Sequence, residues 1–252
     1  MDITHLVVNG CSWTYCQGLD DPKTQGWPAL VAKELGIPVV NIAVPGSGND
    51  SICRRTHEYV YKNLPSESKP FFIIFWSQYW RREAWYEDGD YGKLREYRGV
   101  FPPWQKDNGQ KFDEHSTALM SHWNEEDFLR KTLLNKLSTM NLFKVHDIPY
   151  VMTDFGGKEV NLPMIGLDMK REIDNDRYNF TMDLETEVAI NNYPKLPCGH
   201  DGVEAQKETA KWLLRSINPL FNEILLQSGS FLSLEEFGLL NTLAMKKYTS
   251  WK

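Results

Sequence analysis

A serine and a histidine hold positions in this chain from which they can act together as nucleophile and base. Ser12 follows Gly10 and Cys11 directly after the apolar run 3–8, and His200 stands just before a segment with helical spacing. A serine hydroxyl is a weak nucleophile at neutral pH and needs a base to take its proton. His200 is the best placed of the six histidines for this task, so the pair predicts a hydrolase.

The elements that must position this pair alternate between strands and helices. Four apolar or β-branched runs predict strands, and the segments between them space their apolar residues as helices do. Such an alternation predicts an α/β fold with right-handed crossovers and a mostly parallel sheet covered on both faces. The expected strands are 3–8, 38–42, 71–76 and 148–152, and the expected helices are 27–35, 52–64, 129–140 and 203–217.

Ligands of parallel sheets bind beyond the carboxyl ends of the strands. Ser12, Gly46, Gln78 and Asp154 each follow an expected strand, so we expect them to gather at one edge of the sheet. Asn49 lies close to Gly46 and either caps the next helix or presents its carboxamide to a substrate. Taken alone, a Gly-x-Ser sequence is also common in plain turns.

Composition limits the possible partners. The chain has 252 residues, 41% of them hydrophobic, which is enough for one domain with a sizeable core. A net charge of -6 with scattered basic residues argues against nucleic acid, and no apolar run is long enough for a membrane span. Without a signal-like N-terminus, and with four cysteines that lack paired spacing, we expect a reducing, cytoplasmic setting and no metal.

Four short segments resemble the conserved blocks of the SGNH (GDSL-like) hydrolase superfamily. Residues 9–14 are similar to the first block, with Cys11 in place of the usual aspartate, and residues 40–46 are similar to the second. Residues 75–78 stand where the third block is expected, with Gln78 as its carboxamide. Residues 199–205 resemble the last block around the histidine, although the usual aspartate three positions earlier is Pro197.

The resemblance implies a fold and a mechanism. The fold is a three-layer α/β/α sandwich with a mostly parallel, flavodoxin-like sheet, in one domain over 1–252. The mechanism is ester hydrolysis by Ser12 and His200, without a cofactor. The backbone amides of Ser12 and Gly46, with the side chain of Gln78 or Asn49, would hold the oxyanion. A backbone carbonyl, Asp201 or Asp154 would orient His200, because the usual aspartate is absent.

An aromatic-rich insertion at about 79–123 and a C-terminal helical extension at about 218–252 lie outside the resemblance. Aromatic rings stack on sugars, so we expect a small acyl ester such as an acetylated carbohydrate as substrate, although most of the rings can simply pack the insertion. Arg81 and Arg82 either bind an anionic group of the substrate or form ion pairs. The candidate substrate-binding residues are Trp13, Trp76, Arg81 and Arg82.

Two other functions remain open. The missing aspartate at Pro197, together with Cys11 and Gln78, favours a non-catalytic glycan-binding or assembly protein that retains the fold. A thiol enzyme would use Cys11 in place of Ser12.

Overall fold

The computed structural model describes residues 3–63, 69–87, 95–100, 124–154, 167–176, 179–180 and 193–227. The chain divides into two compact units, one formed by Ile3–Leu213 and the other by Met1–Asp2 with Leu214–Lys252. The residues of the candidate site all belong to the first unit. In the second unit the description covers Leu214–Gln227, the later turns of helix α9 (Val203–Gln227).

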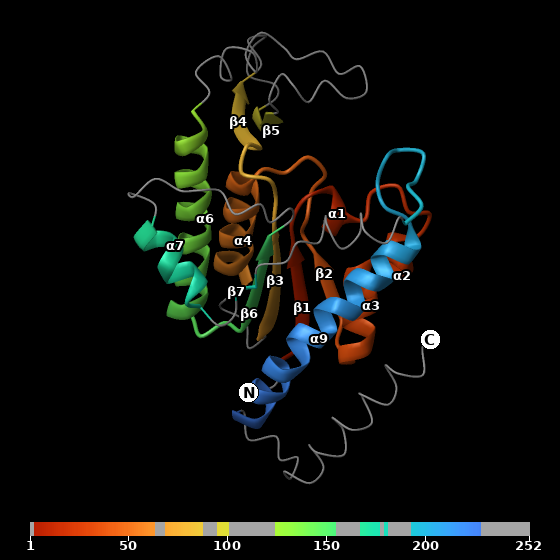
Figure 1. Ribbon diagram of the computed structural model, residues 1–252. Coiled ribbons are helices and arrows are strands. Elements are labelled where there is room, and N and C mark those ends of the chain that lie inside the picture. Colours follow the sequence, from red (N-terminus) through yellow and green to blue (C-terminus); the bar gives the residue numbers. More distant parts are fainter. Residues whose placement is uncertain are drawn as a thin grey trace. The chain divides into compact units, whose positions relative to one another are not determined.

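The centre of the first unit is a five-stranded sheet in the order β2-β1-β3-β6-β7, in which every neighbouring pair is parallel (Figure 1). This order is that of flavodoxin-like folds. The four strands predicted from the sequence are confirmed, and β7 is an additional short strand. The strands are β1 (His5–Asn9), β2 (Val39–Asn41), β3 (Pro70–Trp76), β6 (Tyr150–Asp154) and β7 (Asn179–Phe180).

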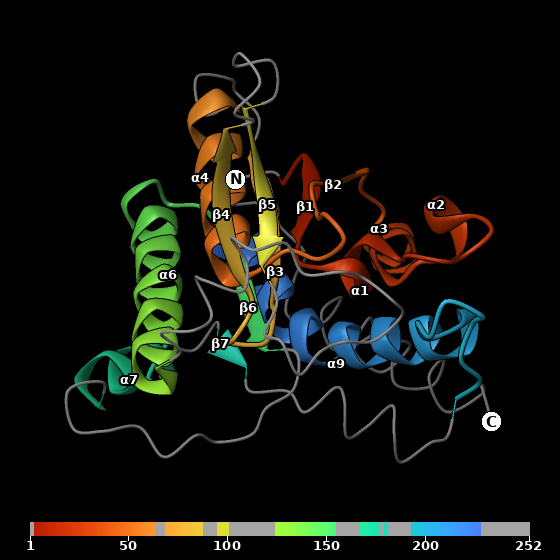
Figure 2. The same ribbon diagram turned by 90° about the horizontal axis from the view of Figure 1, so that it is seen from above.

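Strand β3 is buried on both faces, as its continuous apolar sequence predicts. On one face the ring of Phe75 packs against Trp27, with the ring centroids 5.0 Å apart. On the other face Phe72 packs against Phe143 at 4.7 Å. Because Trp27 belongs to α3 (Trp27–Leu35) and Phe143 to α6 (Glu125–Val145), helices cover both faces and the first unit has three layers (Figure 2).

The four helices predicted from the sequence are confirmed as α3, α4, α6 and α9. The ends of α3 follow local rules, with a proline in its first turn and Gly36 in the left-handed conformation after its last residue. Asn124 caps α6 by accepting a hydrogen bond from the backbone N–H of Asp127 at 3.3 Å. The remaining helices are α1 (Ser12–Tyr15), α2 (Pro22–Gln25), α4 (Asn49–Asn63) and α7 (Leu167–Asp174).

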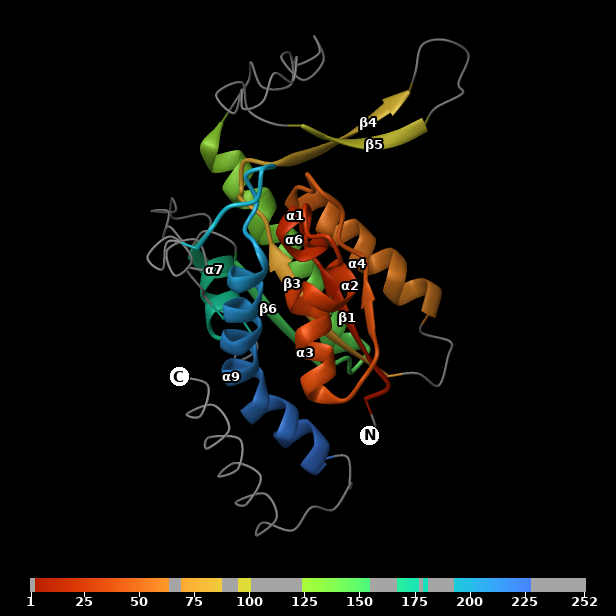
Figure 3. The same cartoon turned by 90° about the vertical axis from the view of Figure 1, so that its right-hand side faces the viewer.

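The segment expected as an irregular insertion contains an antiparallel hairpin of β4 (Arg82–Glu87) and β5 (Arg95–Val100). Figure 3 shows this hairpin beyond the edge of the sheet at which β3 ends. Periodicity did not reveal these strands, because glycines and mixed charges interrupt the apolar pattern on which strand prediction depends.

The expected C-terminal helical extension lies, after residue 227, outside the described residues. Among the residues described, no helix combines the length and the apolar character that crossing a membrane requires.

Candidate active site

Ser12 stands at the turn that leads from β1 into α1. A Cβ atom on Gly10 would lie 2.3 Å from Oγ1 of Thr14 and 3.0 Å from the carbonyl oxygen of Phe75, so only glycine fits here. This close approach folds the chain back sharply after β1 and leaves Ser12 as the first residue of α1. The Ser12 side chain is half-buried, and its hydroxyl forms no hydrogen bond with another described residue.

His200 lies in a tight loop just before α9. Lys195 and Asp201 form an isolated antiparallel bridge, and within it the backbone N–H of Leu196 donates to the carbonyl of His200 at 2.7 Å. These backbone contacts define the conformation of the loop independently of the imidazole ring. The candidate base therefore has a locally ordered backbone.

The loop of the candidate base packs beside the segment that follows the candidate nucleophile. A Cβ atom on Gly18 would lie 2.4 Å from Sγ of Cys198, so the two chain segments are in close contact. Oε1 of Gln206, near the start of α9, accepts hydrogen bonds from the N–H of Trp27 at 3.1 Å and from the thiol of Cys16 at 3.4 Å. Because Cys16 directly follows α1, the fold brings together the two segments that the sequence singles out.

The surroundings of His200 favour its neutral form. Burial is the main cause that lowers its pKa from the ordinary value of 6.5, and the positive charges of Arg81 and Lys195 act in the same direction. The backbone carbonyl of Cys198 and the carboxylate of Asp201 oppose this shift. A neutral imidazole at pH 7 is the form that can accept a proton from a serine.

Neither candidate for the orienting carboxylate is bonded to His200. The carboxylate of Asp201 pairs with the ammonium group of Lys195, and that of Asp154 pairs with the largely buried Lys136. Nδ1 of His200 is buried and has no side-chain partner among the described residues, while the backbone carbonyl of Cys198 acts on the ring as a hydrogen-bond acceptor. Each carboxylate thus has a lysine as its partner, which the sequence did not suggest.

Gly46 and Gln78, the expected oxyanion donors, both follow strands that border β1. Gly46 adopts a positive φ of 78°, which suits glycine, in a turn where the N–H of Ser47 donates to the carbonyl of Val44 at 3.2 Å. The N–H of Val44 in turn donates to the carbonyl of Gly10 at 3.4 Å, which ties this turn to that of Ser12. Oε1 of the Gln78 carboxamide is buried without a hydrogen-bond partner among the described residues. This oxygen only accepts hydrogen bonds, so a contact with an oxyanion would have to come from the amide nitrogen of the same side chain.

Asn49 has a different role from either of the two expected. Its Oδ1 accepts from the N–H of Ser77 at 2.8 Å, and its Nδ2 donates to the carbonyl of Ser77 at 3.0 Å and to Oγ1 of Thr132 at 3.2 Å. The carboxamide is thus fully used within the protein, and Asn49 is the first residue of α4 instead of its cap. It holds the chain directly before Gln78.

The structure does not present Trp76 and Trp13, two of the expected substrate-binding residues, to solvent. Trp76 is fully buried on the face of β3 that packs against α4 and α6, and Trp13 is buried as well. Arg81 lies in the turn after β3 with its guanidinium 5.3 Å from the ring centroid of Trp80, and its charge acts on His200. Arg82 is the first residue of β4, and the structure describes its backbone but not its side chain.

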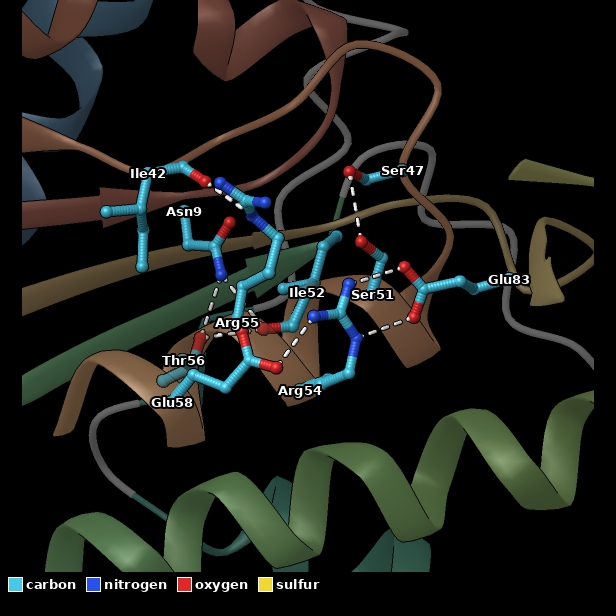
Figure 4. A network of polar contacts seen from close by, with 10 residues as sticks. All are labelled: Asn9, Ile42, Ser47, Ser51, Ile52, Arg54, Arg55, Thr56, Glu58 and Glu83. Atoms are coloured by element: carbon cyan, nitrogen blue, oxygen red, sulfur yellow. Dashed lines mark hydrogen bonds and ion pairs between the residues drawn. The ribbon is translucent and has the colours of Figure 1, made fainter. Parts of the chain in front are cut away.

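Sequence patterns did not identify two asparagines whose side chains bind backbone groups near the site. Asn9 donates through Nδ2 to the carbonyl of Ile52 at 2.8 Å (Figure 4). Its Oδ1 accepts a hydrogen bond from the N–H of Gly10 at 2.9 Å. Asn41 donates to the carbonyl of Thr14, in α1, at 2.7 Å. Each is the last residue of its strand, β1 or β2. A polar carboxamide at the end of an apolar run, directly before a turn, was the available signal.

Metal and thiol chemistry find little support in the described residues. No group of three or more histidine, cysteine or acidic side chains in that part of the chain is arranged to hold a metal ion. The thiol of Cys11 is buried, whereas its neighbour Ser12 is partly accessible. Burial also raises the pKa of the Cys16 thiol to about 12, which makes it unreactive.

Comparison with known proteins shows similarity at the level of structure. No protein-family model matches the sequence, and no curated protein matches it either. Among solved structures, the esterase EstA from Pseudoalteromonas sp. superposes with a TM-score of 0.53 at 11% identity, covering 87% of this chain and 99% of that one. TesA superposes with a TM-score of 0.51 at 15% identity, over 86% and 99% of the two chains.

A third similar structure is the acetyl xylan esterase Est2A from Butyrivibrio proteoclasticus. Its TM-score is 0.50 at 13% identity, and the alignment covers 87% of this chain and 64% of that one. Identities this low establish the architecture alone. Together with the parallel sheet in the order β2-β1-β3-β6-β7, they show that the chain has the α/β/α fold of the SGNH (GDSL-like) esterases.

Proposed function

We propose that the protein is a serine ester hydrolase that uses Ser12 and His200. The observation that carries this proposal is the packing of the His200 loop against the segment after α1, through Gly18 and Cys198. Ser12 and His200 are 188 positions apart in the sequence (200 − 12). A contact between their flanking segments is therefore a property of the fold and not of local sequence.

In the proposed reaction, Oγ of Ser12 attacks the ester carbonyl while His200 accepts the hydroxyl proton. The backbone N–H groups of Ser12 and Gly46, with the carboxamide of Gln78, donate hydrogen bonds to the oxyanion of the tetrahedral intermediate. His200 then returns the proton to the departing alcohol. Water attacks the acyl-serine with His200 again as base, which releases the acid and restores Ser12. No cofactor takes part.

We further propose that the substrate carries a small acyl group, such as acetyl, on a carbohydrate or a similar carrier. The structural similarity to an acetyl xylan esterase supports this class of substrate. The partly accessible turn after β3, with Trp80 and Arg81, is the segment from which a carrier would be contacted.

A non-catalytic binding protein is the second candidate. The observation that favours it is the pairing of Asp201 and Asp154 with lysines, which leaves Nδ1 of His200 without a carboxylate among the described residues. A carboxylate at that position normally fixes the tautomer and stabilises the imidazolium, although it does not take the proton. Without it, catalysis depends on a Ser-His dyad.

The two candidates differ in one experiment. Wild type, S12A and H200A are assayed with a chromogenic acetate ester and with a fluorophosphonate probe, and S138A and H57Q serve as matched controls on the α4–α6 side. We expect labelling and turnover in wild type and in both controls. In S12A and H200A we expect turnover to fall by at least about 10³-fold. A wild-type protein without labelling or turnover across acyl lengths would contradict the hydrolase and favour the binding protein.

A further inference from the structure

The turn that follows β3 carries two of the proposed active-site residues. Gln78 and Arg81 lie in it, and the N–H of Arg81 donates to the carbonyl of Gln78 at 3.1 Å. At its start the turn is anchored by Asn49, which forms hydrogen bonds with both the N–H and the carbonyl of Ser77. The hydrogen bond inside the turn and the anchor at its start do not fix the position of the end of the turn relative to the rest of the site. That position depends on a second contact, at the end that leads into β4.

The second contact is an ion pair between Glu83 and Arg54. Nε of Arg54 donates to Oε2 of Glu83 at 2.9 Å, and Nη2 donates to Oε1 at 2.7 Å (Figure 4). The Glu83 side chain is 7% exposed and that of Arg54 is 26% exposed. The N–H of Glu83 also donates to Oδ2 of Asp50 at 3.4 Å, and Asp50 is held by Asn135 at 2.8 Å.

The geometry makes this pair stronger than an ordinary surface ion pair. Two parallel N–H···O bonds between a guanidinium and a carboxylate restrict orientation as well as distance. The hydrogen bonds to Glu83 are also the main cause that raises the pKa of Arg54 above its ordinary value. Arg54 binds Glu58 as well, at 2.7 Å, but Glu58 is 60% exposed and lies on the same helix. Unlike the bond to Glu58, the bond to Glu83 joins α4 to the strand that follows the turn, beside the contact of Asp50 with the N–H of Glu83.

We propose that Arg54 and Glu83 are positioning residues that hold the Gln78 turn against the Gly46 turn. Asn49, Asp50 and Arg54 all lie in the first two turns of α4, the helix that begins three residues after Gly46 (49 − 46). The helix thus connects the two sides of the proposed oxyanion site, with one side at its N-terminus and the other fastened to its surface. This inference rests on the proposed function.

The expected consequence is a loss in the chemical step. A donor that holds an oxyanion acts in the transition state, and displacement by about 1 Å can cost about a hundredfold in rate. In E83Q the charge is removed while size and shape are kept, so the turn is loosened without a large cavity. We expect kcat to fall at least about tenfold while KM changes by less than about twofold.

The test compares E83Q with E58A, which removes the other partner of Arg54 and leaves the turn attached. Turnover of a chromogenic acetate ester is measured together with amide hydrogen exchange over residues 77–83. We expect faster exchange and a lower kcat in E83Q, and wild-type values of both in E58A. The charge-swapped double variant R54E/E83R should recover part of the kcat lost in E83Q.

The outcomes separate this inference from the proposed function. A wild-type protein that neither turns over the ester nor is labelled by fluorophosphonate at Ser12 overturns the proposed function and this inference with it. An active wild type beside an E83Q variant with unchanged kcat overturns the inference alone, whatever the exchange. A fall in kcat in E58A equal to that in E83Q also overturns it, because the effect would then belong to Arg54 and not to the turn.

Discussion

The carboxylate of Asp201 forms an ion pair with the ammonium group of Lys195 and does not bond to the imidazole of the adjacent His200. The Asp201 side chain is 7% exposed, while that of Lys195 is 56% exposed. A buried carboxylate is stabilised by any cation within reach, and a lysine on a flexible stem reaches it without disturbing the loop. The candidate base therefore stands beside a carboxylate that another residue already uses.

Removal of Lys195 is expected to move the pH dependence of catalysis. Lys195 lowers the pKa of His200, and Asp201 raises it. K195M removes the positive charge of Lys195 and also leaves the carboxylate of Asp201 without this ion pair, so both changes raise the pKa of His200. Because the base must be neutral, we expect the acidic limb of kcat/KM to move to higher pH in K195M. K207M, which breaks the exposed pair with Glu204 in the first turns of α9, is the control. An acidic limb at the same pH in wild type and K195M would show that Lys195 has no influence on the base.

Partly buried histidines are expected to weaken the fold at mildly acidic pH. Burial lowers the pKa values of His5, His57 and His200 below the ordinary 6.5. Below pH 6.5 the unfolded chain binds protons that the folded chain takes up only at lower pH, so the free energy of unfolding falls as the pH drops through this range. We expect Tm to fall between about pH 6.5 and 5 and to fall less steeply in H57Q. Equal slopes in the two proteins would contradict a contribution from His57.

Gly10 is expected to tolerate no side chain. In G10A the new methyl group would lie 2.3 Å from Oγ1 of Thr14 and 3.0 Å from the backbone of Phe75, which cannot move away. We expect the free energy of unfolding to fall by about 1–3 kcal/mol and kcat to fall with it, because Ser12 is displaced. G36A is the control, since it places a side chain at a positive φ far from Ser12 with no atom within 4 Å. It should lower stability without changing kcat, and a similar loss of kcat in G36A would refute the steric explanation.

Loss of the Asn49 carboxamide is expected to be costly. N49A leaves the buried N–H and carbonyl of Ser77 without their partners. Such unsatisfied groups cost about 1–3 kcal/mol each, so we expect the free energy of unfolding to fall by roughly 2–5 kcal/mol in chemical denaturation. N63A makes the same change at the other end of α4, where the side chain donates to the carbonyl of Tyr59 in a less buried place. Losses of equal size in the two variants would count against the special role of Asn49.

The strands and helices were predictable because their causes are local. The run from Phe71 to Trp76 is apolar throughout, which fits a strand covered on both faces, and the spacing in 129–140 fits a helix with one buried side. The hairpin β4–β5 was not predictable in the same way. Its strands are stabilised by pairing with each other across an intervening segment, and neither has a clear apolar periodicity of its own.

The site was predictable only in outline. That Ser12 and Gly46 follow neighbouring parallel strands could be inferred from the order of elements, because carboxyl ends of parallel strands share an edge. The role of Asn49 could not, since its partner Ser77 is 28 positions away and only the packing of α4 on the sheet brings the two together. Trp76 belongs to a strand whose continuous apolar sequence already indicates burial on both faces, and the structure buries its side chain there.

The sequence by itself determined the α/β architecture and the two segments on which the proposed chemistry depends, the turn at Ser12 and the loop at His200. Only the tertiary structure decided which partners the charged and polar side chains take: Lys195 for Asp201, Lys136 for Asp154 and Arg54 for Glu83. Hydrophobic periodicity is a property of neighbouring residues and can be followed along the chain. The partner of a buried charge depends on the distance and direction of groups from other elements, which exist only once the chain has folded.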